Sequence, residues 1–308
     1  MTSVSLEDVE HARTIVAGRV RRTPSLESSA LGVSLKAELF QHTGSFKARG
    51  ALNRIAALTP EERQRGVVTW SAGNHAAAVA WAAAQEGVDC VVEMWEGVNP
   101  LKVEATRGHG ATVDLAPPDP AAAYDRVLEI VEEQGRVFVH PPSDPLVVAG
   151  HGTLALELLE DLPDIQTVVV GTGGGGLISG IVTALDGRAR IVGVAPERAQ
   201  AFPAGLAAGH SVRVETDTIA DGLAPPFAGE LPIKLCRGRV ETVLVTEDEI
   251  AEGMRFLYAR AKLACEPAGA AAAGAVLAGK VDSGRGVAVI VSGGNVDPHQ
   301  AAAILREQ

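Results

Sequence analysis

Residues 167–185 read TVVVGTGGGGLISGIVTAL and combine three features in one short stretch. Thr167 to Val170 is a β-branched run, Gly171 to Gly176 is rich in glycine, and Leu177 to Leu185 forms an apolar, helical pattern. A strand, a glycine turn and a helix in this order are typical of an α/β unit with a parallel sheet. Because glycine lacks Cβ, the turn can approach a ligand closely, and the N–H groups of the following helix can bind an anion. The stretch therefore predicts an α/β fold with a site for a phosphate group.

The same alternation of short apolar strands and helical stretches extends along the chain on both sides of this unit. The predicted strands span residues 35–38, 66–70, 90–94, 113–115, 137–139, 191–194 and 287–291, and the other predicted helices span residues 47–57, 75–85, 100–108 and 121–133. Strands that are apolar at nearly every position favour parallel sheets covered on both faces. Three strands end in turns rich in Gly, Ser and Asn, at residues 71–75, 171–176 and 292–295. Because ligands bind outside the carboxyl ends of strands in open α/β sheets, these turns are candidates to meet at one site.

The composition restricts the classes of function. The chain has 308 residues, a net charge of −11 and only 4% aromatic residues, which disfavours nucleic acids and anionic membranes as partners. Cys90, Cys236 and Cys265 have neither metal-ligand spacing nor a disulfide pattern, so we expect buried thiols in a reducing compartment. The first 20 residues lack the apolar core of a signal peptide, and no apolar run is long enough to span a bilayer. These observations predict a cytoplasmic protein that acts on a small molecule.

The glycine turn itself allows three interpretations. It fits the pattern Gly171-x-Gly173-x-x-Gly176, and Glu197 lies shortly after the next predicted strand, as in a nicotinamide (NAD) dehydrogenase. Four consecutive glycines in the middle of the chain, however, suit the wrapping of one compact phosphate group. A purely structural turn is the third interpretation, although long glycine runs carry a cost in folding entropy. A P-loop is excluded because no Gly-Lys-Ser/Thr follows the glycines.

Lys47 is the candidate for covalent chemistry. It follows Thr, Gly and Ser at residues 43–45, which we expect to cap a helix that runs to about Ala57. For a lone lysine, an exposed position in the first helical turn would be the ordinary expectation. The surrounding sequence SFKARGA, at residues 45–51, changes this expectation because it resembles the cofactor-lysine motif of fold-type II pyridoxal-phosphate enzymes.

Five further segments resemble motifs of the same family and occur in the same order. They are SAGNH at residues 71–75, GGGG at 173–176, TIADG at 218–222, EPAGA at 266–270 and SGGN at 292–295. The six motifs extend the resemblance over nearly the whole chain, and they are most similar to the branch that contains serine/threonine dehydratases and serine racemase. The resemblance implies an α/β fold like that of the tryptophan synthase β chain, with two three-layer domains and mostly parallel sheets. Residues 1–60 and 145–308 would form a large cofactor-binding domain and residues 61–144 a small one, and the chain would be a homodimer.

The resemblance also implies a role for individual residues. Lys47 would hold pyridoxal 5'-phosphate as a Schiff base and, once substrate displaces it, take the α-proton. The residues implied in cofactor binding are Phe46, Lys47, Asn74, Gly173, Gly174, Gly175, Gly176, Leu177, Gly222, Glu266, Ser292 and Gly293. The residues implied in substrate binding are Ser71, Ala72, Gly73, Asn74 and His75. A hydroxyl at Ser292, facing the pyridine nitrogen, need not keep that nitrogen protonated, which favours elimination over transamination.

The implied function is a lyase that converts L-threonine or L-serine to a 2-keto acid and ammonia. Serine racemase, 3-hydroxyaspartate dehydratase and β-replacement activities stay open within the same cofactor class. A nicotinamide dehydrogenase and a metabolite-binding protein without catalysis are the alternatives from other classes. Because only about a dozen residues follow Asn295, we expect no C-terminal regulatory domain and a catabolic role.

Three positions depart from the family pattern. Ala72 stands where racemase-type members carry a second serine that protonates the carbanion, so a dehydratase is favoured over a racemase. Glu197 and Ala201 match two positions of a Mg²⁺ or Ca²⁺ site found in some relatives, but Pro203 replaces the carboxylate at the third, which weakens such a site. His151 stands where relatives often carry glutamine, and we expect it to be a polar core residue with satisfied hydrogen bonds.

Overall fold

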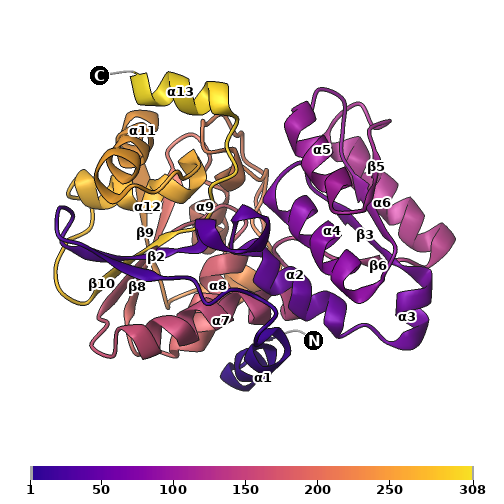
Figure 1. The fold of residues 1–308 in the computed structure, drawn as a ribbon, viewed down its shortest axis with the longest axis horizontal. Helices are drawn as coiled ribbons and strands as arrows, with labels where there is room; N and C mark the ends of the chain where they lie inside the picture. Colours follow the sequence, from indigo (N-terminus) through magenta and orange to yellow (C-terminus); the bar gives the residue numbers. More distant parts are fainter. Residues whose placement is uncertain (1–2, 307–308) are drawn as a thin grey trace.

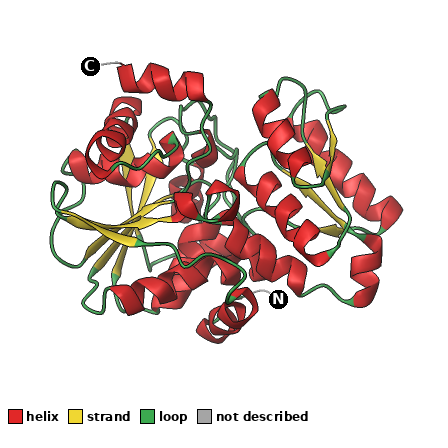
Figure 2. Cartoon of the chain, in the orientation of Figure 1, coloured by secondary structure: helices red, strands yellow, loops and turns green. Residues whose placement is uncertain are grey.

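The structure, a computed structural model, describes residues 3–306 and contains two β-sheets (Figures 1 and 2). The larger sheet has the strand order β1-β2-β10-β7-β8-β9, and among its described strands only β1 runs antiparallel to its neighbour. Its strands are β1 (Ser25–Ser28), β2 (Val33–Ala37), β7 (Thr167–Gly171), β8 (Arg190–Pro196), β9 (Glu241–Val245) and β10 (Val287–Val291). The central strands β7 and β10 are buried at every position, which explains why both are almost wholly apolar.

The smaller sheet has four parallel strands in the order β5-β4-β3-β6. They are β3 (Val67–Trp70), β4 (Cys90–Glu93), β5 (Thr112–Asp114) and β6 (Val137–Phe138). Helix α4 (Asn74–Glu86) covers one face of this sheet, and α6 (Pro120–Gln134) covers the other. We call this sheet with its helices the four-stranded unit, and the rest of the fold the six-stranded unit.

Helices also cover both faces of the six-stranded sheet. Val169 and Val289 pack on the face of α11 (Glu247–Phe256) and α12 (Pro267–Leu277). Their neighbours Val168 and Ala288 pack on the opposite face, with α7 (Pro145–Asp161), α8 (Gly176–Leu185) and α1 (Leu6–Val16). The strands therefore supply two hydrophobic cores, one on each side, as expected of a three-layer α/β arrangement.

The remaining helices lie at the edges of these layers or between them. They are α2 (Lys47–Ala56), α3 (Pro60–Arg65), α5 (Pro100–Gly108), α9 (Ala201–Ala208), α10 (Glu230–Cys236) and α13 (Pro298–Arg306). Helix α2 packs against α7 within the six-stranded unit and against α4 of the four-stranded unit, so it lies where the two units meet (Figure 1). None of the helices in the described part of the chain is both long and apolar enough to cross a membrane.

The expected α/β class with mostly parallel sheets is confirmed, and the predicted strands and helices lie within a few residues of the observed ones. The three cysteines are free and buried, as expected. The predicted cap of α2 is wrong. Phe46 occupies the N-cap position without a side-chain hydrogen bond, and the hydroxyl of Ser45 is buried without a partner. The backbone of Ser45 is instead extended and forms an isolated β-bridge with Gly293.

Candidate active site

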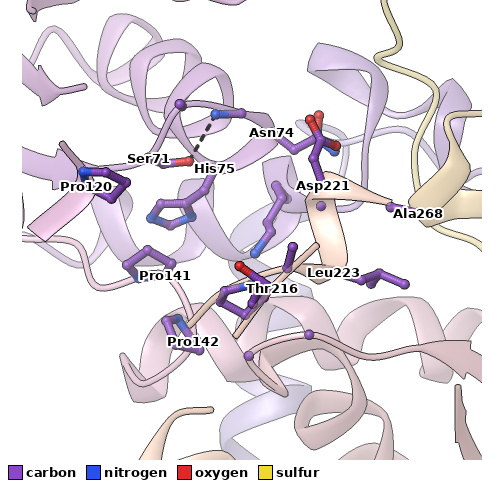
Figure 3. Close-up of a pocket in the computed structure, with 18 of the residues that line it drawn as sticks. Ser71, Asn74, His75, Pro120, Pro141, Pro142, Thr216, Asp221, Leu223 and Ala268 are labelled. Atoms are coloured by element: carbon purple, nitrogen blue, oxygen red, sulfur yellow. Dashed lines mark hydrogen bonds between the residues drawn. The ribbon is translucent and has the colours of Figure 1, made fainter. Parts of the chain in front are cut away.

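A cavity of about 1630 Å³ is lined by both units (Figure 3). Its walls come from the ends of β3, β7 and β10, from the start of α2, and from loops that include residues 141–142 and 213–217. It is lined by nearly all the residues that the sequence singled out: Phe46, Lys47, Ser71, Ala72, Gly73, Asn74, His75, Gly173, Gly174, Gly175, Gly176, Leu177, Gly222, Glu266 and Ser292. The structure therefore brings together motifs that lie far apart along the chain.

Backbone contacts fix the start of α2 against the end of β10. An isolated antiparallel bridge joins Ser45 to Gly293, and the N–H of Phe46 donates to the carbonyl of Ser292 at 3.0 Å. As a result Lys47 and Ser292 line the same cavity, together with the turns that follow β3 and β7. The three turns at strand carboxyl ends thus share one site, which is the arrangement that parallel α/β sheets favour.

Lys47 presents an amine without a counter-ion. Among residues 3–306 its Nζ has no hydrogen bond or ion pair, and it lies 5.0 Å from the centre of the Phe46 ring. Burial lowers the pKa of Lys47 to about 8, and the nearby carboxyl of Glu266 limits this lowering. An amine with such a pKa is neutral for a useful fraction of the time near pH 7, as a nucleophile or base requires.

Glu266 and Asn74 form a hydrogen-bonded pair beside this amine. Asn74 Nδ2 donates to Glu266 Oε1 at 2.7 Å, and Asn295 Nδ2 donates to Asn74 Oδ1, also at 2.7 Å. Burial, and then the charge of Asp221, raise the pKa of Glu266 to about 8. The chain of bonds fixes the orientation of the Asn74 amide, which lies on a different unit from Glu266 and Asn295.

The glycine turn, which we call the glycine cradle, has no room for side chains at its glycine positions. A Cβ on Gly173 would lie 2.8 Å from Pro225, and one on Gly175 would lie 2.6 Å from Phe202, at a φ of +88°. In the described structure the N–H groups of residues 173–175 donate to no backbone carbonyl, and Gly176 begins α8, where the first N–H groups have no intrahelical acceptor. The turn therefore offers several free donors and a helix N-terminus to an anion.

The turn at residues 71–75 lies across the cavity, at the start of α4 (Figure 3). Gly73 is the N-cap of this helix, and the Ser71 hydroxyl accepts a hydrogen bond from the Gly73 N–H at 3.2 Å. Nε2 of His75 lies 3.0 Å from the Val139 carbonyl, while Nδ1 is buried without a partner. Burial, and then the charge of Lys47, lower the pKa of His75 to about 3, so the imidazole is neutral.

Some predicted residues lie elsewhere. Gly293 does not line the cavity but lies behind Glu266, since a Cβ at Gly293 would meet Glu266 Oε1 at 2.3 Å. Glu197 and Ala201 lie outside the cavity, and the described residues contain no cluster of three or more His, Cys, Asp or Glu suited to a metal ion. The expectation that His151 has satisfied hydrogen bonds is wrong, because neither ring nitrogen has a partner and its ring packs edge-on against Phe46.

Sequence reasoning missed several residues that shape the site. The aromatic side chains of Trp70, Tyr124 and Phe227 line the cavity, and no motif marks them. Two polar contacts between residues of the cavity lining also join the two units: Lys102 to Asp221, and Asn99 Nδ2 to Asp297 Oδ2 at 2.9 Å. Only contacts in the folded chain reveal them. Asn295 could have been found, because it ends the SGGN motif.

The donor set suits one kind of ligand, a phosphate-bearing aldehyde such as pyridoxal phosphate. The free N–H groups of the glycine cradle match the phosphate, and the unpaired amine of Lys47 matches the aldehyde. Both line one cavity, together with the Asn74 amide and the Ser292 hydroxyl, which can hydrogen-bond a ring. The residues present therefore fit the cofactor that the resemblance implies.

Comparisons with known proteins agree with this site. The family model described as "Pyridoxal-phosphate dependent enzyme" matches residues 16–293. The L-threonine ammonia-lyase of Thermotoga maritima is 43% identical, over 99% of this chain and 79% of that protein. The catabolic L-threonine dehydratase of Escherichia coli K12 is 39% identical, over 98% of this chain and 96% of that protein. The structure of maize serine racemase superposes with a TM-score of 0.92 at 34% identity, covering 98% of this chain and 96% of that one. With a match over most of its length and relatives at this level of identity, the chain belongs to the pyridoxal-phosphate-dependent enzymes.

Proposed function

We propose that the chain is an ammonia-lyase that converts L-threonine or L-serine to a 2-keto acid and ammonia. The observation that carries this proposal is the meeting, in one cavity, of an unpaired lysine amine, a glycine cradle for phosphate and a helix N-terminus for a carboxylate. The names of the relatives, which are threonine ammonia-lyases and dehydratases, support the same reaction class. A nicotinamide dehydrogenase would leave the buried amine of Lys47 without a role.

In this proposal the chain's own residues bind, orient and exchange protons. Lys47 binds the cofactor aldehyde, and residues 173–176 bind its phosphate through N–H groups. Asn74 and Ser292 hydrogen-bond the cofactor ring, and Phe46 packs beside it. The N–H groups of the turn at residues 71–75 bind the substrate carboxylate, and the hydroxyl of Ser71 assists them.

Pyridoxal phosphate, when bound, supplies an electron sink that makes the substrate's α-proton acidic. Lys47 Nζ accepts that proton, for which a pKa near 8 is well suited. The Cα–H and Cβ–O bonds break, and the hydroxyl leaves as water. The released enamine takes up one water, so the balanced products are a 2-keto acid and ammonia.

Racemisation is the competing activity, since serine racemase has a closely similar structure. It requires a proton donor on the face of the substrate opposite to Lys47. Ala72 lines the cavity in the loop where that donor would stand, and a methyl group cannot transfer a proton. We therefore expect elimination to exceed racemisation by a wide margin.

We further propose that the protein acts in the cytoplasm as a homodimer, as the family resemblance implies. Light scattering combined with size exclusion tests the dimer. A mass near 32 kDa, that of one chain of 31.8 kDa, would refute it.

The function is tested with the purified protein reconstituted with pyridoxal phosphate. We expect a visible absorbance band, borohydride trapping of the cofactor on the peptide that contains Lys47, and equal release of ammonia and keto acid from L-threonine or L-serine. The substrate panel includes 3-hydroxyaspartate, and chiral analysis measures D-serine formed from L-serine. A folded protein that binds no cofactor would refute the proposal, and D-serine formation as fast as pyruvate formation would establish the racemase instead.

A further inference from the structure

The cavity has an aromatic end that a threonine-sized substrate does not need. Trp70 ends β3, directly before the Ser71 loop, Tyr124 lies on α6, and Phe227 lies in the loop before α10. The rings of Trp70 and Phe227 are nearly parallel, with centres 6.4 Å apart, and Tyr124 meets Trp70 edge-on at 5.4 Å. We call these three side chains the aromatic wall.

The aromatic wall is not a piece of ordinary core. The chain contains three Trp, two Tyr and six Phe, and among the described residues only Phe202 is buried in a core cluster. The three side chains of the wall stay partly exposed where they line the cavity. Nε1 of Trp70 and Nδ1 of His140, which packs on Tyr124, are buried without hydrogen-bond partners. Unpaired polar atoms are rare in a settled core, so these two nitrogens set the wall apart from ordinary packing.

The position of the wall fits a side-chain subsite. Trp70 is covalently next to Ser71, the first residue of the turn to which the substrate carboxylate is assigned. Figure 3 shows Pro120, Pro141 and Pro142 on the side of the cavity where Ser71 and His75 lie, away from Ala268. Pro120 lies on α6 with Tyr124, while Pro142 borders the glycine cradle, since a Cβ on Gly174 would lie 3.0 Å from it. A carboxylate held at the turn therefore has apolar walls close by on the same side of the cavity.

The volume supports the same conclusion. Pockets for drug-sized ligands occupy about 300–1,000 Å³. This cavity measures about 1630 Å³, and the cofactor with threonine, whose side chain beyond Cβ is one methyl and one hydroxyl, would leave much of it unfilled. Aromatic side chains contribute large contact areas to such pockets.

We propose that the aromatic wall binds the β-substituent of the substrate, and that the preferred substrates are 3-hydroxy amino acids with an aromatic or large apolar side chain. This inference rests on the proposed ammonia-lyase function and narrows its substrate class. The reaction is unchanged: 3-phenylserine loses its α-hydrogen and β-hydroxyl as water, takes up one water, and yields phenylpyruvate and ammonia.

The first test compares the reconstituted enzyme's kcat/KM for threo-3-phenylserine and for L-threonine, by keto-acid release. Burying one aromatic ring predicts a preference for phenylserine of about ten- to hundredfold. Phe227→Ala should lower kcat/KM for phenylserine at least about tenfold more than it lowers kcat/KM for L-threonine, and so remove most of this preference. Phe227→Leu should fall between the two, and it replaces the alanine variant if that variant does not fold. Leu128→Ala, at an exposed position of α6, is the matched control and should change neither value.

A binding measurement separates the subsite from catalysis. L-phenylalanine and L-2-aminobutyrate lack the β-hydroxyl and cannot eliminate it, so both act as competitive inhibitors. We expect L-phenylalanine to bind the holoenzyme at least about tenfold more tightly, and Phe227→Ala to abolish the difference. A preference for threonine and for L-2-aminobutyrate, or a ratio that Phe227→Ala leaves unchanged, would overturn the inference and leave the ammonia-lyase intact. Absence of keto acid from every substrate would instead refute the function on which the inference rests.

Discussion

Lys47 and Arg49 lie two residues apart at the start of α2, but Arg49 is fully buried whereas Lys47 is only partly buried and lines the cavity. The guanidinium of Arg49 donates to both carboxylate oxygens of Glu38 at 2.8 Å and to both oxygens of Glu157 at 2.6 and 2.9 Å. Lys36 donates to Glu157 at 2.7 Å as well. These two cations and two carboxylates, which we call the arginine cluster, satisfy one another. Burial lowers the pKa of Arg49, but the charges and hydrogen bonds of Glu38 and Glu157 outweigh burial and raise that pKa above its ordinary value.

The other cluster, which we call the lysine cluster, comprises Lys47, Glu266, His75 and His151. Burial shifts the pKa of each member in the direction that favours its neutral form. It lowers the pKa of Lys47 to about 8, that of His75 to about 3 and that of His151 well below the ordinary value, and it raises the pKa of Glu266 to about 8. Several of its polar atoms have no partner. One helix thus carries a guanidinium with a full set of ionic partners and, two residues away, an amine that has none among the described residues.

Replacing Lys47 should have the largest effect on activity and little effect on folding. Lys47→Met removes the amine that binds the cofactor aldehyde in our proposal, so we expect activity to fall by at least about 10³-fold and the visible band to vanish. Because desolvation already disfavours the charged form of this amine, the cofactor-free variant should be as stable in urea as the cofactor-free parent, or more so. Substantial remaining activity would contradict the assignment of Lys47.

Replacing Arg49 should have the reverse effect. Arg49→Met leaves the fully buried Glu38 without its cation, and removal of one partner from a buried ion pair costs about 3–5 kcal/mol. We expect urea unfolding to report a loss of this size, with near-normal kcat in the molecules that still fold. Adding Glu38→Gln should restore part of the loss. An unchanged unfolding midpoint would show that the arginine cluster does not hold the fold together.

Glu93 extends the comparison of the two clusters, because its carboxylate lacks hydrogen-bond partners among the described residues although it does not line the cavity. It is fully buried at the end of β4, and neither carboxylate oxygen has a hydrogen-bond partner. Burial, and then the charge of Asp114, raise the pKa of Glu93 to about 7 from an ordinary value of 4.5. The folded protein thus binds this proton more tightly than the unfolded chain does. The resulting stabilisation is full below about pH 4.5 and is lost as the pH rises through 7.

Glu93→Gln cannot ionise and should therefore escape this loss. At pH 8 we expect the variant to be more stable than the parent by about 3 kcal/mol, and the difference to shrink towards pH 5. Urea unfolding at the two pH values measures both quantities. Glu129→Gln, at an exposed position, is the control and should show no such dependence. A Glu93 variant that is less stable at pH 8 would mean that the carboxylate has a partner in solution.

The difference between the clusters also shows what the sequence can predict. Lys47, the glycine turn and the turn at residues 71–75 were predictable because each is a local motif that needs a particular backbone. The arginine cluster was not, since Glu38 and Glu157 reach Arg49 from segments 11 and 108 residues away. The aromatic wall could not be predicted either, because its three residues also come from segments that are distant in the sequence. The orphaned nitrogens of His151 could not be foreseen either, because the close approach of Gly50 to its ring depends on how α2 packs against α7.

Replacing Glu266 should have the smallest of these effects, a shift in the pKa of Lys47. Its negative charge raises the pKa of Lys47 and so opposes the effect of burial. Glu266→Gln keeps a carbonyl oxygen for the Asn74 amide but removes this charge, so the pKa of Lys47 should fall by up to about one unit. In the cofactor-free protein, the rate at which an amine-specific reagent labels Lys47 should then reach its midpoint at a lower pH. Glu93→Gln, which removes a carboxyl that does not contribute to the pKa of Lys47, should leave that midpoint unchanged. A midpoint that stays fixed or rises in Glu266→Gln would mean that burial alone sets the basicity of Lys47, and that the carboxyl serves only to orient Asn74.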